Sequence, residues 1–337
     1  MARQVNFGLW YDFRNPARWR VPFETLYEQS LEQIAWAETI GFNSVWLTEH
    51  HFCDDGYTPS PLVIAAAIGA RTQRMRIGTN IIQMPLHDPI RLAEDTATLS
   101  LLTGGRFDLG VAIGYREFEF AAFKRKLENR PSLMEESVEI LRRAWRGESI
   151  KFNGKRFQMN DVRVTPTPEH APKILIGGMA PAAIERAARI GDGFLSTGGI
   201  GHDVYAAATQ QLKTPTERNA IIAGDWSVVA ADPEREAALI GDHVLYQTNE
   251  YVSWGAFGPP DQVPLFPDAA SALRDGLYQL STPEAAVERL SGMLKQYPQI
   301  VDVHFWAQFP GESIASGTRR IECLAKDVLP KVRAAIS

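Results

Sequence analysis

Three adjacent ionisable residues, Glu49, His50 and His51, directly follow an apolar run in the sequence. The run, Ser44 to Thr48, is typical of a buried strand, so the three side chains emerge where that strand ends. Imidazole exchanges protons near neutral pH, because its unperturbed pKa is about 6.5. General acid or base catalysis is therefore one interpretation, and a structural histidine hydrogen-bonded in the core is another. Alternation along a strand points the two histidines to opposite faces, and the residues alone leave open which of them faces the site.

Metal ligation is a third interpretation, with Asp54 or Asp55 as an additional ligand. Neighbouring strand residues point to opposite faces, so His50 and His51 cannot easily share one ion. No HExxH or comparable spacing occurs in the chain. We therefore expect no metal site, and a metal-dependent barrel hydrolase is disfavoured.

Strand-like and helix-like segments alternate from end to end of the chain. Eight segments are continuously apolar, as expected for strands that are covered on both faces. They span 5–13, 44–52, 75–85, 107–115, 173–179, 193–199, 220–230 and 300–309. Eight successive strand–helix units predict an α/β fold, a closed (β/α)8 TIM barrel, rather than an open doubly wound sheet. Residues 1–337 are thus expected to form a single domain.

Two insertions interrupt this rhythm. Residues 148–170 predict a hairpin with a turn at Asn153-Gly154, followed by a proline-rich connector. Residues 231–283 lie between the seventh and eighth strands, and from 251 onward they are rich in Pro, Gly and aromatic residues.

The second insertion is expected near the barrel mouth, where lids lie. Its side chains Trp254, Phe257 and Phe266 are apolar enough to close over a planar ring. A dimer contact is the alternative role for this segment.

The composition indicates a globular protein of a reducing compartment. The chain has 337 residues, 45% of them hydrophobic, and a formal net charge of −5, which gives no electrostatic reason to bind nucleic acid or anionic membranes. Its two cysteines cannot form a disulfide framework. No N-terminal signal pattern and no apolar run of about 18 residues occurs, so we expect a cytoplasmic protein.

Active sites of barrels lie where the strands end. Polar side chains fall at several predicted strand ends, namely Asp12, Asn80, Gln83, Tyr115, Thr197 and Gln308. The pair Gly177-Gly178 fits a phosphate-binding turn before a helix, and it fits an ordinary tight turn equally well. No GxGxxG fingerprint follows an early strand and no GxxxxGK[ST] loop exists, so a Rossmann-bound dinucleotide or a nucleoside triphosphate is not expected.

Several stretches resemble the luciferase-like monooxygenase family, whose type member is the α chain of bacterial luciferase. They are FGLW (7–10), GFNSVWLTEHHF (41–52), RIGTNIIQMPLHDPIRLAED (76–95), TGGRFDLGVAIGY (103–115), PKILIGGMAPAAIERAARIGDGF (172–194) and STPEAAVERL (281–290). The resemblance implies a flavoprotein monooxygenase that uses reduced FMN and O2. A C4a-(hydro)peroxyflavin would oxygenate a small organic substrate, as in an alkanal monooxygenase. It further implies a flavin reductase that supplies the reduced FMN, and a homodimer is expected.

The resemblance also assigns residues. The catalytic acid/base falls at His50, with Glu49 and His51 as supporting neighbours, and a non-prolyl cis peptide under the flavin falls at Asn80-Ile81. The implied contacts to the flavin ring and its phosphate are Ile113, Tyr115, Arg130, Gly177, Gly178, Met179 and Thr197.

The sequence departs from luciferase after the fourth strand. The reactive cysteine of the luciferase α chain is Ala112 here, and the arginine beside it is Ile113. The next arginine is displaced by one position, with Pro131 in its place and Arg130 before it. We therefore expect flavin to bind more weakly or in a different arrangement.

Two alternatives remain open. One is an oxidoreductase that uses the deazaflavin F420 for hydride transfer and does not activate oxygen. The other is a non-catalytic flavin-binding partner subunit. The EHHF form favours FMN, and the presence of His50 argues against a non-catalytic subunit. The residues do not identify the organic substrate.

Overall fold

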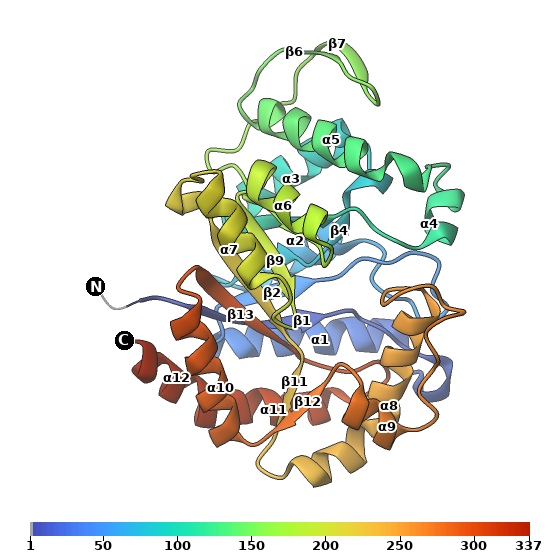
Figure 1. The fold of residues 1–337 in the computed structure, drawn as a ribbon, viewed down its shortest axis with the longest axis vertical. Helices are drawn as coiled ribbons and strands as arrows, with labels where there is room; N and C mark the ends of the chain where they lie inside the picture. Colours follow the sequence, from blue (N-terminus) through green and yellow to red (C-terminus); the bar gives the residue numbers. More distant parts are fainter. Residues whose placement is uncertain (1–2) are drawn as a thin grey trace.

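The computed structural model describes residues 3–337, and its centre is a closed barrel of eight parallel strands (Figure 1). The strands are β1 (Asn6–Tyr11), β2 (Ser44–Leu47), β3 (Arg76–Thr79), β5 (Phe107–Ala112), β8 (Ile174–Gly177), β9 (Gly193–Thr197), β10 (Ala220–Asp225) and β13 (Ile300–Trp306). Each pairs with its neighbour in this order, β13 pairs with β1, and the β3–β5 pairing of Ile77 with Phe107 completes the ring. The predicted TIM barrel is confirmed.

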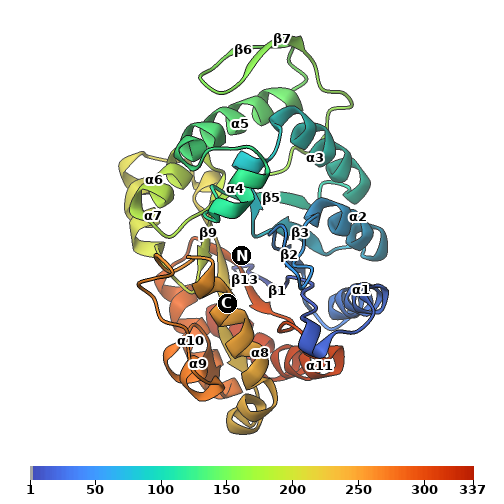
Figure 2. The same ribbon diagram turned by 90° about the vertical axis from the view of Figure 1, so that its right-hand side faces the viewer.

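Helices surround these strands (Figure 2). They are α1 (Phe23–Thr39), α2 (Pro61–Arg71), α3 (Pro89–Thr103), α4 (Glu117–Ala122), α5 (Arg130–Trp145), α6 (Pro181–Ile190), α7 (His202–Gln211), α8 (Pro233–Ser253), α9 (Ala269–Asp275), α10 (Pro283–Gln296), α11 (Ile314–Cys323) and α12 (Leu329–Ile336). Many begin with proline, which loses no hydrogen bond at the first helical turn. Among the described residues, no helix is both long and apolar enough to cross a bilayer.

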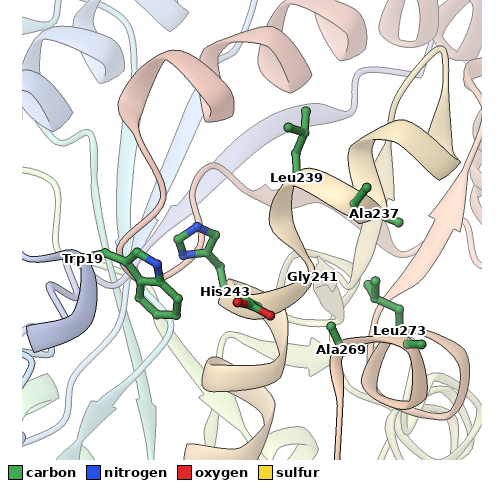
Figure 3. Close-up of a pocket in the computed structure, with 10 residues that line it drawn as sticks. Trp19, Ala237, Leu239, Gly241, His243, Ala269 and Leu273 are labelled. Atoms are coloured by element: carbon green, nitrogen blue, oxygen red, sulfur yellow. The ribbon is translucent and has the colours of Figure 1, made fainter.

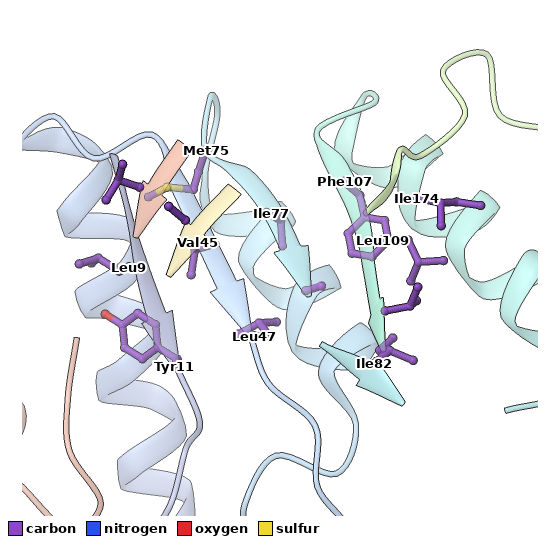
Figure 4. Packing of buried hydrophobic residues seen from close by; sticks show 14 of the residues in the cluster. Leu9, Tyr11, Val45, Leu47, Met75, Ile77, Ile82, Phe107, Leu109 and Ile174 are labelled. Carbon is purple, nitrogen blue, oxygen red and sulfur yellow. The ribbon is translucent and has the colours of Figure 1, made fainter. Parts of the chain in front are cut away.

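Alternation along the strands divides the core into two clusters. Leu9, Val45 and Ile77 belong to the larger cluster, which joins the strands to residues of the covering helices and is partly shown in Figure 4. Trp10 and Trp306 belong to the smaller cluster, which joins inward-facing residues of several barrel strands to Ile240 and Val244 of α8, and their rings stack with centroids 4.3 Å apart. Strands that contribute to both clusters are apolar on both faces, which explains their continuous apolar runs in the sequence.

All eight barrel strands are shorter than the predicted segments, and three of them end or divide where the chain leaves the barrel at its mouth. The segment 44–52 stops pairing after Leu47, and the N–H of His50 donates to the Thr58 carbonyl instead. The segment 75–85 is interrupted between β3 and β4 (Ile82–Gln83). The segment 220–230 divides into β10 and β11 (Ser227–Val229), and β11 pairs with β12 (Gln279–Ser281) outside the barrel.

The first insertion forms the predicted hairpin, β6 (Ile150–Asn153) with β7 (Gln158–Val162), which projects beyond α5 in both views. Its turn lies later than predicted, because Asn153 still pairs with Gln158. The Glu136 carboxylate of α5 accepts the backbone N–H groups of Lys155, Arg156 and Phe157, and this fixes a longer turn.

The second insertion, 231–283, is largely helical. It begins with α8, which is simply the helix of the seventh barrel unit, and it contains α9 and β12. The irregular part is the short stretch 254–268 between α8 and α9.

Gly110 of β5 provides a test of barrel packing. A Cβ atom built on Gly110 would lie 1.7 Å from the Thr79 carbonyl oxygen and 2.6 Å from Leu195 Cδ1. Overpacking of this kind costs about 1–3 kcal/mol, so Gly110→Ala should lower the free energy of unfolding in urea by at least this amount. The matched control is Gly292→Ala, on an exposed site of α10 with no atom within 4 Å of the new Cβ, which should raise stability by about 0.5–1 kcal/mol. Equal effects of the two changes would contradict this packing.

Candidate active site

The carboxyl ends of the barrel strands enclose a cavity of about 430 Å³. Two of the three predicted catalytic residues, Glu49 and His50, line it, and His51 does not. The cavity is also lined by every residue expected to contact the flavin, namely Asn80, Ile81, Ile113, Tyr115, Arg130, Gly177, Gly178, Met179 and Thr197. The peptide bond between Asn80 and Ile81 is cis, which confirms that prediction. Closure of the barrel thus brings together side chains that are far apart in the sequence.

His50 lies in the cavity wall and is 7% exposed. Its Nδ1 is 2.9 Å from Glu119 Oε1, and its Nε2 is 3.3 Å from the Tyr115 hydroxyl. The rings of Tyr57 and Trp254 pack against the imidazole, with centroids 4.8 and 5.1 Å away. Burial lowers the pKa of His50, although the hydrogen bond and charge of Glu119 oppose this shift. The imidazole is therefore neutral at neutral pH.

Glu119, from α4, is the polar residue that holds His50. Its Oε1 also accepts the backbone N–H of His51 at 2.8 Å and Arg116 Nη1 at 2.9 Å, and its Oε2 accepts Gln83 Nε2 at 2.7 Å. Burial alone would raise the pKa of Glu119, but the hydrogen bond and charge of His50 and the bonds from His51 N–H and Gln83 bring it below its usual value.

An ionised carboxylate only accepts hydrogen bonds, so His50 must carry its proton on Nδ1 and donate it to Glu119. The unprotonated Nε2 is then left on the side of Tyr115 and the cavity. This arrangement can accept a proton from a bound molecule and return it, which is what general acid–base catalysis requires.

In residues 3–337 no hydrogen bond joins Glu49 or His51 to His50, and their supporting role stays a prediction. Glu49 Oε2 accepts the backbone N–H of Gln83 at 2.6 Å, and Oε1 is 2.9 Å from His87 Nε2. Burial alone would raise the pKa of Glu49, but His87 and His51 bring it well below its usual range. The predicted divergence of the two histidines is confirmed. Its cause is different, because residues 48–52 form a loop and not a strand.

Sequence reasoning missed Glu119 altogether. It lies between Phe118 and Phe120 in the short helix α4, and only Glu119 of the acidic pair in that helix is buried. Nothing in the local pattern distinguishes it from Glu117. The feature that distinguishes Glu119 is its burial, which is visible only in the folded structure.

One end of the cavity suits an anion. Gly177 and Gly178 precede α6, whose first residue, Pro181, has no N–H, and the Ala183 and Ile184 N–H groups both donate to the Ala180 carbonyl. The helix dipole, rather than a row of free N–H groups, therefore favours an anion at this end of α6. A Cβ on Gly178 would lie 2.5 Å from the Ala183 Cβ, so this turn packs closely on its helix. Arg130 is held at the cavity by bonds from Nε and Nη1 to the carbonyls of Leu127 and Gly114. A helix N-terminus with an arginine nearby is a site for a phosphate group.

The remaining wall is mainly apolar and includes Trp10, Leu195 and Phe257. Two buried polar atoms of this wall, Gln83 Oε1 and Trp226 Nε1, have no hydrogen-bond partner in residues 3–337. They leave one acceptor and one donor for a ligand whose planar ring is apolar on its faces and polar at its edge. The isoalloxazine of FMN and the deazaflavin ring of F420 both fit this description, and their phosphate fits the opposite end.

Part of the second insertion lies at the cavity, and its role as a lid stays a prediction. Phe257 lines the cavity, and the Trp254 ring packs on His50. The guanidinium carbon of Arg116 lies over the same Trp254 ring, 4.2 Å from its centroid. Phe266 does not line the cavity, because its backbone is tied to Asn249 of α8 by hydrogen bonds in both directions.

Two polar residues predicted at strand ends also lie outside the cavity lining. Asp12 Oδ2 accepts Gln247 Nε2 at 3.0 Å, and Gln308 Nε2 donates to the Glu312 carbonyl at 2.7 Å. Both are buried and serve to hold neighbouring segments together.

A second cavity, of about 540 Å³, lies between Trp19, α8 and α9 (Figure 3). Apart from Asp242 and His243, its lining consists of Trp19 and small or apolar residues such as Leu239 and Leu273. It contains no group comparable to the His50–Glu119 pair.

A family model described as luciferase-like monooxygenase matches residues 6–239. An F420-dependent glucose-6-phosphate dehydrogenase from Amycolatopsis mediterranei is 31% identical over 176 residues, which are 50% of this chain and 53% of the relative. The chain thus spans about half the length of the curated relatives it matches.

Solved structures share the fold over nearly the whole chain. Monooxygenase RslO1 from Streptomyces bottropensis is 22% identical, with a TM-score of 0.78 over 97% of this chain and 99% of that one. The oxygenating constituent of 3,6-diketocamphane monooxygenase from Pseudomonas putida, in complex with FMN, is 16% identical, with a TM-score of 0.76 over 97% and 98%. At these identities the likeness concerns the fold.

Replacement of Glu119 tests the geometry around His50 without any ligand. The Glu119 carboxylate raises the pKa of His50, so Glu119→Gln should move that pKa further below its usual value. NMR titration of the histidine side chains measures this directly. Glu128→Gln, a change at an exposed glutamate nearby, should leave the titration unchanged. An unaltered His50 titration in Glu119→Gln would contradict the proposed hydrogen bond.

Proposed function

Because the chain belongs to the luciferase-like monooxygenase family, we propose that it is a monooxygenase that uses reduced FMN and O2 to oxygenate a small organic molecule. The observation that carries this proposal is the His50–Glu119 pair in the wall of a sheltered, largely apolar cavity with an anion-binding end. Relatives in the family include both FMN- and F420-linked oxidoreductases.

Reduced FMN, when bound, supplies the activation of O2. The protein's part is to hold the phosphate at α6 and Arg130, and to place the ring against Ile81. His50 Nε2 takes up or returns the proton that the oxygenation moves, and the ionised Glu119 stabilises the charge that His50 then carries.

Exclusion of water is the second part of the protein's role. Trp254, Phe257 and Trp226 surround the cavity with aromatic surface. Activated oxygen species are lost when water reaches them, so a dry site protects the reaction. A separate reductase as the source of reduced FMN and a homodimeric assembly are part of the same proposal.

An F420-dependent hydride transfer is the second candidate. It is favoured by the curated relatives, among which F420-dependent glucose-6-phosphate dehydrogenases recur at 29–33% identity. In this case the same cavity would hold the deazaflavin, and His50 would exchange a proton with the alcohol or carbonyl group of the substrate.

Anaerobic titration with reduced FMN and with reduced F420 separates the two candidates. We expect binding of reduced FMN with a Kd in the micromolar range (~1–10 µM), followed on mixing with O2 by a transient absorbance change that free FMN does not give. Tight binding of F420 with no change in its oxygen reaction would favour the second candidate. Turnover by this chain alone would exclude a non-catalytic partner subunit.

His50→Ala tests the proton transfer. Turnover on an accepted aldehyde, ketone, terpenoid or sulfur compound should fall by about 10²–10⁴-fold, the usual contribution of a positioned acid or base, while FMN affinity stays within a few-fold. The control is His170→Ala, at an exposed histidine outside the cavity. Normal turnover in His50→Ala would refute the role of His50.

The pH dependence follows from the lowered pKa of His50. Because the neutral imidazole is the active form, kcat/KM should fall as the pH decreases through a pKa below about 6.5, and should be level near neutrality. A profile that instead falls with rising pH at neutrality would show that a protonated group is needed. Measurement in Glu119→Gln should shift the acid limb to lower pH.

A further inference from the structure

A carboxylate and two imidazoles meet beside the loop that carries His50. The ligand atoms of Glu49, His51 and His87 all lie within 4.8 Å of one another. His87 Nε2 is 2.9 Å and His51 Nε2 is 3.6 Å from the same oxygen, Glu49 Oε1. We call these three residues the Glu49 cluster.

We propose that the Glu49 cluster binds a divalent transition-metal ion of the zinc type. Two imidazole nitrogens and one carboxylate oxygen are a ligand set that Zn²⁺ accepts, with a water completing its coordination. The set has mixed nitrogen and oxygen donors and no thiolate, so it suits Zn²⁺, Co²⁺ or Ni²⁺ better than Ca²⁺ or Mg²⁺. The sequence led us to expect no metal site, and His87, 38 positions from Glu49, was not among the ligands considered.

One nitrogen of the Glu49 cluster is unsatisfied. His51 Nε2 is buried, and it has no hydrogen-bond partner among residues 3–337. Its distance of 3.6 Å from Glu49 Oε1 is too long for a direct hydrogen bond. The hydrogen bond to Glu49 accounts for the position of His87 Nε2, but it provides no partner for His51 Nε2. A metal ion would bind both of these nitrogens.

The ligands are held in place before any ion arrives. The Glu49 side chain has no exposed surface, and its second oxygen accepts the Gln83 N–H at 2.6 Å. The His51 backbone N–H donates to Glu119, and the His51 ring packs on Phe123 with centroids 4.8 Å apart. Fixed outer partners of this kind orient ligands and raise metal affinity.

An ion can reach the cluster from solvent. The His87 side chain is 28% exposed, while those of His51 and Glu49 are 12% and 0% exposed. Glu49 also lines the cavity, whereas His51 and His87 do not, and His50 is not one of the cluster's ligands. Occupancy of the cluster would fix the loop that carries His50.

Titration with Zn²⁺ alone tests the proposal and involves no flavin, so its outcome is independent of the proposed function. The full chain, freed of metal with a chelator, should bind one Zn²⁺ per chain in a calorimetric titration. His51→Ala and His87→Ala should each weaken this binding by more than about 100-fold, since loss of even an outer-shell partner costs about 10–100-fold.

The controls are His170→Ala and His243→Ala, two histidines outside the cluster, which should leave stoichiometry and affinity unchanged. Circular dichroism checks that each variant is folded. Co²⁺ provides a readout that needs no variant, because ligation by nitrogen in a site of low coordination gives visible bands much stronger than those of the aqueous ion. Absence of a stoichiometric site, an aqueous-type Co²⁺ spectrum, or equal binding by folded His51→Ala and His87→Ala would overturn the proposal.

Discussion

The hydrogen bond between His50 and Glu119 is the interaction on which the chemistry of the cavity depends. Glu119 can remain ionised inside the protein only because donors surround it. These donors belong to the loop after β2, to the segment after β3 and to the start of α4. One carboxylate therefore fixes both the protonation pattern of His50 and the relative positions of three segments that are distant in the sequence.

This arrangement requires a barrel that closes tightly. β3 and β5 pair over only two residue positions. Close packing at the neighbouring positions must therefore complete the closure of the barrel between these two strands. Glycine makes this contact possible, because a Cβ on Gly78 would lie 2.2 Å from the ring of Trp46, and one on Gly110 would overlap the Thr79 carbonyl. The strand ends converge on one cavity because these residues carry no side chain.

The barrel and most of the cavity lining were predictable from the sequence. Continuous apolar runs mark all eight strands, and the family resemblance placed Asn80, Arg130 and Gly177 on the cavity wall. Strand ends were less predictable, because residues such as His50 stop pairing with the barrel for reasons that depend on a distant carbonyl.

Partners across loops were not predictable at all. Glu119 lies in the short helix α4, whose sequence resembles an exposed surface segment. His87 follows a different element, the 3-10 turn Met84–Leu86. Each meets its partner only after the strands have brought separate loops to the same end of the barrel. Phe266 does not line the cavity for a similar reason, since hydrogen bonds to Asn249 hold its backbone elsewhere.

The aromatic wall around the cavity has a spectroscopic consequence. Of the eight tryptophans in the chain, Trp10 and Trp226 line the cavity and Trp254 packs on His50. An oxidised, yellow isoalloxazine that enters this space would lie beside Trp10 and Trp226, and it absorbs where indoles emit. Quenching of the intrinsic tryptophan fluorescence can therefore report the binding and release of the ring without any added label.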